Sequence, residues 1–410
     1  MTGLRQLMIG NYIIMRVMKF LKDIFVVRFL VISLMILLSG CSSTKPVKRP
    51  VSIKTTHFVE GSFSELDGWE KDHHEKSFNA FVRSCNKIIK RKKGSEKAGD
   101  DLPKWKSVCK SAISLSQSIG DIDNLKGSKL SRARHLSKAF FEKNFKPYKI
   151  GMSDHGRNLT FNSRFTGYYE MELQGTRRKD PKFPYPIYSP PKDLCRLKGS
   201  SSITRKSINK GFLNGKNLEI AWVNDMPRLY FLQIQGTGTI RLKEGGDLKL
   251  VWGGENGYKF KPLPKEYIGS TLHVMKQLRA NGQKGFNDMD LNQSYIFFKE
   301  RKEPFPVGAQ AVMLTPERSA AIDSRIYPYG IPIWIEAKLP FVKGYSKGEK
   351  FNRMLVGQDR GGAIKGGGRL DLFFGRGRHA ESVGGAFNVL GDMYVLYPKD
   401  IKLPEKFNLK

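Results

Sequence analysis

Residues 357–385 read GQDRGGAIKGGGRLDLFFGRGRHAESVGG, and this stretch decides the fold of the chain. It places two carboxylates, Asp359 and Asp371, among ten glycines. Glycine at this density permits tight turns and a close approach of the backbone to a ligand, at an entropic cost to folding. Around Asp371, apolar residues at alternate positions predict a short strand whose carboxylate lies on the face opposite the main apolar stripe. Such a strand directs Asp371 toward a groove, although turn formation or pairing with an arginine would also explain both aspartates.

The chain is long and strongly basic. Its 410 residues are enough for two or three domains with a sizeable core. The formal charge is +33, from 71 Lys and Arg against 38 Asp and Glu. This balance favours an anionic partner, which can be nucleic acid, a lipid surface or an acidic polymer, and composition does not choose among them.

The first forty residues narrow the choice among these anionic partners. Basic residues precede an apolar run over residues 29–38, which is too short to span a bilayer, and Leu38-Ser39-Gly40-Cys41 follows directly. The arrangement resembles a bacterial lipoprotein signal. The resemblance implies a signal peptide over residues 1–40, lipidation of Cys41, a tether over residues 41–60 and sorting to the periplasmic side of the outer membrane. We expect no nucleic-acid partner for an exported protein, and the true start stays open among Met1, Met15 and Met18.

Two cysteines mark a helical region that we expect over residues 61–158. Cys85 and Cys109 each lie on the apolar face of a helical pattern, and we expect the two faces to meet. In an oxidising compartment such cysteines can form a disulfide, but buried free cysteines are also common, so both states stay open. If Cys85 and Cys109 form a disulfide, Cys195 is left unpaired. The sequence has no CxxC pair and no HExxH motif, so we expect no metal site and no cofactor.

From about residue 159 the sequence consists of short apolar runs broken by Gly, Pro and Asn. This pattern predicts barrels or sandwiches rather than alternating βαβ units. A helical pattern over residues 267–280 interrupts the series, so we place two β modules at residues 159–288 and 289–400. The clearest strand candidates are residues 218–223, 229–234 and 331–337.

Several polar and aromatic residues of these modules are candidates for substrate contact. Tyr168 and Tyr169 can stack on sugar rings, although such tyrosines are more often core residues. As a strand, residues 229–235 would place Gln233 and Gln235 on one face, where two amides can bind hydroxyl or N-acetyl groups or form a solvated edge. Asn256 is a turn residue first and a ligand contact second.

A third aspartate, Asp323, ends an apolar run just before a strand rich in Pro and Gly. It is a candidate site residue or the cap of a turn.

Taken together, these motifs resemble the membrane-bound lytic murein transglycosylase A family. The resemblance covers roughly residues 163–398 and weakens in the cysteine helices. The final motif alone also marks a wider group of three-aspartate domains. The motifs that carry the resemblance are GYYE from Gly167, FLQIQGTG from Phe231, GGENGYKF before Ile268, LNQSYIFF from Leu291, LTPERSAAIDS from Leu314 and QDRGGAIKGGGRLDLFFGRG from Gln358.

The resemblance implies a mainly β fold with N-terminal helices. A double-psi β-barrel would carry Asp371 as the catalytic residue, with Asp359 and Asp323 as its supporting pair. A smaller inserted β-barrel would line a groove between the two. The substrate contacts that the resemblance implies are Tyr168, Tyr169, Gln233, Gln235, Gly236, Asn256 and Gly366.

Two residues depart from the family pattern. Met171 stands where Pro is usual, which alters a turn. Arg360 stands where Thr is usual, which brings a cation next to Asp359.

The resemblance implies a peptidoglycan lytic exotransglycosylase, a carbon–oxygen lyase that forms 1,6-anhydromuramic acid ends. The residues themselves leave endo or exo cleavage open. The expected partners are peptidoglycan strands, outer-membrane lipid through Cys41, and cell-wall synthesis or division proteins. The alternatives are a non-catalytic peptidoglycan-binding lipoprotein of the expansin-like type and a plain hydrolase. An aspartic protease is disfavoured, because Arg360 breaks the D-[TS]-G motif.

Overall fold

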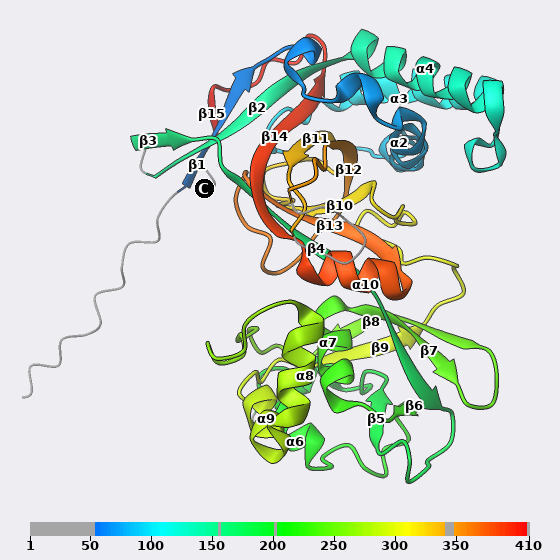
Figure 1. Cartoon of the computed structure of the whole chain (residues 1–410), viewed down its shortest axis with the longest axis vertical. Coiled ribbons are helices and arrows are strands. Elements are labelled where there is room, and N and C mark those ends of the chain that lie inside the picture. The colour runs from blue at the N-terminus through cyan, green and yellow to red at the C-terminus, as the bar shows by residue number, and fades with distance from the viewer. Residues whose placement is uncertain (1–53, 155–156, 201–202, 341–347, 408–410) are drawn as a thin grey trace, which may run out of the picture. The chain divides into compact units, whose positions relative to one another are not determined.

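The computed structural model describes residues 54–154, 157–200, 203–340 and 348–407 (Figure 1). The expected signal peptide, Cys41 and most of the tether lie outside these residues. No helix among the described residues is long and apolar enough to cross a membrane.

Three long helices follow the first strand. Asp101 begins the second of them by accepting a hydrogen bond from the Lys104 backbone N–H, with proline in the first turn. The structure joins Cys85 and Cys109, which lie on the first and second helices, as a disulfide, while Cys195 is exposed and free. The elements of this region are η1 (Phe63–Glu65), η2 (Trp69–Lys71), α2 (His74–Ile88), α3 (Leu102–Ile119), η3 (Ile122–Asn124) and α4 (Gly127–Asn144).

The helical region is shorter than the sequence predicts. Residues 145–154 form a strand, β2, which pairs on one side with β1 and on the other with β14. The alternating apolar positions of this segment are buried, and Phe145 and Ile150 are fully so. The N-terminal region therefore contributes to the sheet as well as covering it.

A large mixed sheet of fifteen strands forms the body of the described chain. Its main path runs β15-β1-β2-β14-β11-β12-β10-β13-β4-β7-β8-β9, and three of these pairs are parallel, namely β10 with β12, β13 with β4, and β4 with β7. The strands are β1 (Lys54–Glu60), β2 (Phe145–Asp154), β3 (Arg157–Thr160), β4 (Ser163–Thr176), β5 (Tyr185–Tyr188), β6 (Glu219–Val223), β7 (Thr237–Leu242), β8 (Asp247–Glu255), β9 (Ile296–Glu300), β10 (Ser319–Ile322), β11 (Pro332–Ala337), β12 (Arg353–Asp359), β13 (Arg369–Arg376), β14 (Asn388–Pro398) and β15 (Lys406–Phe407).

Strand β4 belongs to two parts of the sheet. Its first half pairs with β13 and β14, and its second half pairs with β6 and β7 (Figure 1). Glu170 lies where the two halves meet. It is fully buried, accepts from Thr239 at 2.6 Å and forms an ion pair with Arg301. One continuous strand and one buried ion pair thus connect the two parts.

More helix is present than a mainly β chain would have, so the fold is mixed α/β with N-terminal helices. The predicted strands at 218–223 and 331–337 are confirmed as β6 and β11, and the predicted helix at 267–280 is confirmed as α8. The remaining helices are α5 (Leu194–Leu197), α6 (Arg205–Asn209), α7 (Met226–Gln235), α8 (Thr271–Ala280), α9 (Gly282–Asp290) and α10 (Gly377–Ala386).

The predicted strand at residues 229–234 is wrong, because these residues lie in helix α7. Asp225 caps the helix by accepting from the Arg228 backbone N–H at 3.1 Å, and Pro227 occupies its first turn. Gly236 ends it in the left-handed conformation, with φ of 74°. These start and stop signals outweigh the strand-like alternation of apolar and polar residues.

Candidate active site

Asp359 and Asp371 lie in one row across the sheet. Ala321 of β10 is opposite Asp359 of β12 on one side and opposite Asp371 of β13 on the other. Asp371 is in turn opposite Thr166 of β4. Residues paired across neighbouring strands point to the same face, so both carboxylates flank the small side chain of Ala321.

A β-bulge in β12 sets this row. Ala320 lies opposite Gly357, whereas the next residue, Ala321, lies opposite Asp359, so Gln358 is the extra residue on β12. Bulges re-aim side chains and are common beside active sites. Here Gln358 is fully buried, and Asp359 takes the face that carries Asp371.

The Asp371 carboxyl titrates closer to neutral pH than an ordinary aspartate. Burial raises its pKa to about 6, and the neighbouring Asp359 pushes in the same direction. The Thr166 hydroxyl, which donates to Asp371 over 2.5 Å, and the Arg369 guanidinium both oppose this rise. A carboxyl group with this pKa can both give and take a proton under mild conditions.

Asp359 is more extensively hydrogen-bonded. The Tyr168 hydroxyl donates to it at 2.8 Å, and the backbone N–H groups of Ala309 and Arg360 donate at 2.9 and 2.8 Å. Burial raises the pKa of Asp359, although these three hydrogen bonds and the Arg360 charge favour its ionised form. Tyr168 therefore serves as a hydrogen-bond donor to a site carboxylate.

Asp323 holds a turn. It follows β10 directly and accepts from Arg325 through both carboxylate oxygens, at 2.9 and 2.5 Å, and from the Gly366 backbone N–H at 2.7 Å. Burial alone would raise the pKa of Asp323, but these contacts outweigh burial and lower it below its usual value. Gly366 has φ of 95°, which favours glycine. Asp323 thus fixes the glycine-rich loop, and the Gly366 N–H is already engaged.

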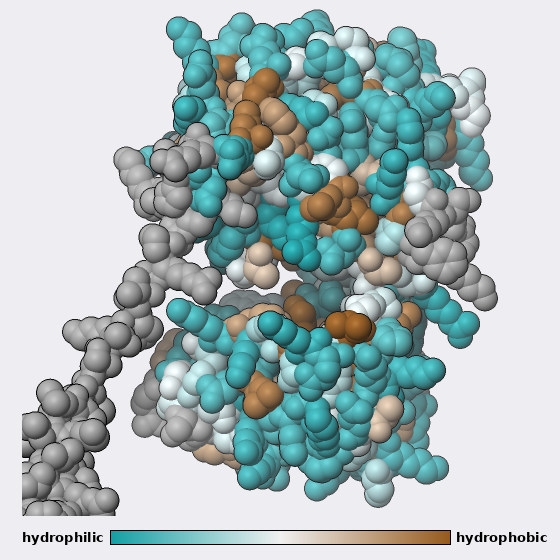
Figure 2. All heavy atoms as spheres, turned by 60° about the vertical axis from the view of Figure 1, so that its left-hand side comes forward, coloured by the Kyte–Doolittle hydropathy of each residue, from teal (hydrophilic) through white to brown (hydrophobic). Residues whose placement is uncertain are grey.

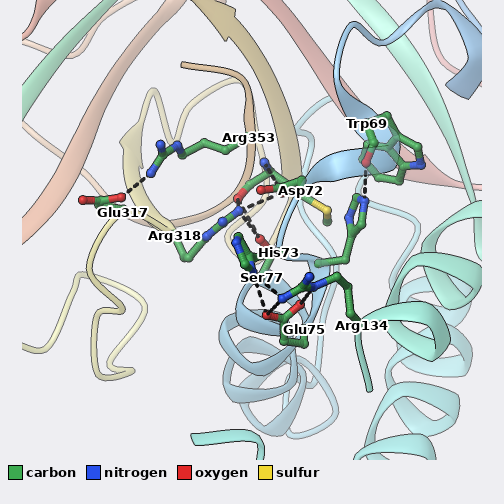
Figure 3. A network of polar contacts seen from close by, with 11 residues as sticks. Trp69, Asp72, His73, Glu75, Ser77, Arg134, Glu317, Arg318 and Arg353 are labelled. Atoms are coloured by element: carbon green, nitrogen blue, oxygen red, sulfur yellow. Dashed lines mark hydrogen bonds and ion pairs between the residues drawn. The ribbon is translucent and has the colours of Figure 1, made fainter. Parts of the chain in front are cut away.

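A buried ion pair holds the strands that lead to the site (Figure 3). Asp72, just before α2, accepts from Arg318 at 2.7 Å and from the Met354 backbone N–H at 3.0 Å. Arg318 precedes β10 and Met354 lies in β12, so one carboxylate connects the strands that carry Ala321 and Asp359.

A close backbone contact positions β4 beside α10. A Cβ added at Gly167 would lie 2.7 Å from the Gly384 carbonyl oxygen and 2.7 Å from the Phe374 ring. No side chain fits there, which explains the glycine of the GYYE motif. The helix can therefore approach the strand segment that presents Thr166 and Tyr168.

The sequence pattern of the MltA specific insert domain matches residues 164–299, and that of the 3D domain matches residues 318–397. The chain belongs to the MltA family. The second of these regions contains Asp323, Asp359 and Asp371.

Membrane-bound lytic murein transglycosylase A of Escherichia coli K12 is a relative within the MltA family. It is 29% identical over 246 residues, which cover 57% of this chain and 66% of the relative. The match therefore spans slightly less than two thirds of that protein.

Solved MltA structures have a similar fold. The structure of a membrane-bound lytic murein transglycosylase from Agrobacterium tumefaciens matches with a TM-score of 0.68 and 25% identity, covering 84% of this chain and 98% of that one. E. coli MltA with bound chitohexaose matches with a TM-score of 0.61 and 24% identity, covering 83% of this chain and 94% of that one.

Three of the residues expected to contact substrate are buried instead. Gln233 accepts from the buried Arg205 guanidinium, which lies 4.7 Å from the centre of the Tyr230 ring. Asn256 uses both amide hydrogens on the backbone carbonyls of Ile203 and Gln293. The ring of Tyr169 is also buried. The sequence pattern did not identify Arg205, the buried cation that donates a hydrogen bond to Gln233.

Gln235 and Gly236 remain accessible in part. Gln235 accepts from the Tyr169 backbone N–H at 3.3 Å, and its amide nitrogen has no hydrogen bond to the rest of the described chain. Gly236 is the cap of α7. Gln235 is therefore the predicted amide that can still reach a ligand.

Sequence reasoning also missed Thr166 and Arg369. Thr166 alternates with Tyr168 along β4, and this two-residue period was a usable signal that both share a face. Arg369 donates to Thr166 at 2.8 Å and so belongs to the same network. The described residues contain no cluster of three His, Cys, Asp or Glu side chains that could hold a metal.

Proposed function

We propose that this chain is a lytic transglycosylase of peptidoglycan. It cleaves the β-1,4 bond between N-acetylmuramic acid and N-acetylglucosamine and leaves a 1,6-anhydromuramic acid end. The observation that carries the proposal is the buried carboxyl of Asp371, whose pKa is raised to about 6, beside a second carboxyl at Asp359. The named activity of the E. coli relative supports it.

A single acid–base residue is sufficient for this reaction. Protonated Asp371 donates its proton to the glycosidic oxygen, and the bond to the leaving N-acetylglucosamine breaks. The resulting carboxylate then accepts the proton of the 6-hydroxyl of the same N-acetylmuramic acid as that oxygen bonds to C1. Because the nucleophile is already part of the substrate, it has the advantage of a tethered group, and no second carboxylate has to activate water.

The neighbours of Asp371 tune this cycle. Asp359, held by Tyr168 and two backbone N–H groups, provides a negative charge that favours protonated Asp371. Thr166 orients the Asp371 carboxyl through its short hydrogen bond. Asp323 keeps the loop in place through Gly366 and acts on the reaction only indirectly.

We further propose that the substrate lies between two barrels. Residues 289–400 would form a double-psi barrel with the helices of residues 61–158 packed on it, and residues 159–288 an inserted smaller barrel. Figure 2 displays one face of the molecule, which is largely hydrophilic and hollowed across its middle. Gln235 is the preferred candidate for contact with an N-acetyl group.

We also propose a location in the cell for this protein. The lipoprotein-like signal and Cys41 would anchor the protein to the periplasmic side of the outer membrane, where peptidoglycan is within reach. The net charge of +33 suits a polymer that carries carboxylates. Contacts with cell-wall synthesis or division proteins are part of this expectation.

The test is product analysis on purified sacculi. The wild-type protein should release 1,6-anhydromuropeptides, identified by chromatography and mass spectrometry. Asp371→Asn should lose at least about a hundredfold in rate, because it can neither donate nor accept the proton. Asp123→Asn, an exposed carboxylate on η3, is the matched control and should keep full activity.

Two outcomes would overturn the proposal. A folded Asp371→Asn protein that still releases anhydro products excludes the assigned acid. Binding of sacculi by the wild type without soluble product favours the expansin-like binding protein, and reducing ends in place of anhydro ends favour a hydrolase.

A further inference from the structure

Two arginines face each other beside the candidate acid. Arg164 of β4 lies directly opposite Arg369 of β13, just as Thr166 lies opposite Asp371. Arg164 precedes Thr166 by two residues, and Arg369 precedes Asp371 by two residues, so all four side chains share one face. The pair of arginines lies about 7 Å along the strands from the pair formed by Thr166 and Asp371. Like charges directly opposite each other destabilise a strand pair. A bound anion would reduce the repulsion between these two guanidinium groups.

Neither guanidinium forms an ion pair with a carboxylate of the described residues, although the Asp371 charge favours the cationic form of Arg369. Arg369 donates to the Thr166 hydroxyl at 2.8 Å and to the Leu370 carbonyl at 2.5 Å. Arg164 donates through Nε to the Asn388 amide oxygen at 3.0 Å. Burial lowers the pKa of Arg369, Asp371 raises it, and the Arg164 charge lowers it again, so the two cations are close enough to repel.

Arg164 offers the open end of this pair. Its side chain is exposed, and its Nη1 and Nη2 groups have no acceptor among the described residues. A guanidinium with both terminal nitrogens free matches the two oxygens of a carboxylate. Leu390 lies opposite Arg164 on its other side and is 57% exposed, so an apolar group attached to the anion could pack there.

We propose that Arg164 and Arg369 form a carboxylate site for the O3 substituent of N-acetylmuramic acid. The inference rests on the proposed function and adds the part of the substrate that this chain selects. The carboxylate has two sources. In peptide-free glycan it is the lactyl carboxylate, and in peptide-bearing glycan it belongs to the stem peptide. The site therefore distinguishes peptidoglycan from a neutral chitin oligosaccharide of the same length.

The test measures binding in the Asp371→Asn background, which needs no turnover. The probes are chitotetraose, a peptide-free tetrasaccharide of alternating N-acetylglucosamine and N-acetylmuramic acid, and the same tetrasaccharide with stem peptides. Isothermal titration should show that at least one acidic ligand binds about tenfold more tightly than chitotetraose at low salt. Added salt should reduce this preference.

The arginine variants identify the site. Arg164→Gln should cut the preference to about threefold or less, and Arg164→Lys should keep part of it. Arg132→Gln, an exposed arginine on α4, should leave it unchanged. Preference for the peptide-free ligand supports the site with the lactyl carboxylate, and preference confined to the peptide-bearing ligand supports it with a peptide carboxylate. Equal binding of all three probes, or a preference that survives Arg164→Gln, overturns the inference. Failure of the transglycosylase proposal would instead appear in the product analysis of the wild type.

Discussion

The hydroxyl of Thr166 donates to the Asp371 carboxyl over 2.5 Å. Two residues further along β4, Tyr168 donates to Asp359 at 2.8 Å. One strand thus supplies a hydrogen bond to each carboxylate of the row, and β4 continues into the part of the sheet where it pairs with β7. A change in the path of this strand would alter both carboxylates together.

Removing the Thr166 hydroxyl should move the pH profile. The hydrogen bond from Thr166 opposes the burial that raises the pKa of Asp371 to about 6. In Thr166→Val that pKa should rise further, by about half a unit to one unit. In the proposed mechanism, activity requires protonated Asp371, so the alkaline limb of kcat/KM should move to higher pH by the same amount. Thr160→Val, in the exposed strand β3, is the control, and an unmoved alkaline limb in Thr166→Val would contradict the role of this hydroxyl.

Asp371→Asn should stabilise the protein at neutral pH. The folded-state pKa of Asp371 is about 6, above the usual 3.8, so ionisation at pH 7 disfavours the folded state. This cost is absent below about pH 4, where both states are protonated, and grows as pH rises through the folded pKa. Urea unfolding should show the Asp371→Asn variant gaining up to about 3 kcal/mol at pH 7 and little at pH 4. An equal difference at both pH values would mean that ionisation is not the cause.

The two aspartates of the row could be singled out from the sequence more readily than their surroundings. Asp359 and Asp371 were accessible to pattern reasoning because carboxylates among glycines are rare and because apolar alternation defines β13. The bulge at Gln358 was not accessible, since it depends on pairing with β10, which is distant in sequence. The burial of Gln233 was also hidden, because it depends on a cation contributed by α6, Arg205.

The α7 error has a similar origin. A short run of alternating apolar and polar residues fits a strand and a helix equally well, and the caps decide between them. Asp225 and Pro227 before the run, and Gly236 after it, are local signals that could have identified the helix from the sequence. No local signal marked Arg164 and Arg369 as neighbours, since only the parallel pairing of β4 and β13 brings them together.

Gln233 and Gln235 should respond differently to replacement by alanine. Gln233→Ala leaves a buried Arg205 donor without its acceptor, so the free energy of unfolding should fall by about 1–3 kcal/mol. Gln235→Ala removes the long 3.3 Å acceptor of the Tyr169 backbone N–H and an amide nitrogen that the described chain does not use, so stability should fall less than in Gln233→Ala while KM rises roughly tenfold. Thermal unfolding and steady-state kinetics measured on both variants check this contrast. A large loss of stability in Gln235→Ala, or a raised KM with unchanged stability in Gln233→Ala, would reverse these assignments.

Breaking the ion pair between Asp72 and Arg318 should destabilise the site from a distance. Burial alone would raise the pKa of Asp72, but Arg318 and the Met354 N–H lower it below its usual value, so its stabilising effect is present above about pH 4 and is lost as pH falls further. Asp72→Ala leaves a buried, unpaired guanidinium and should cost about 3–5 kcal/mol in the free energy of unfolding at pH 7. The double variant Asp72→Leu with Arg318→Met removes both charges and should recover most of that loss. The control is Asp67→Ala, which breaks an exposed ion pair with Lys350 and should change stability little. Denaturant unfolding measures all three, and a double variant as unstable as Asp72→Ala would show that packing, and not the unpaired charge, is what holds β10 and β12 in place.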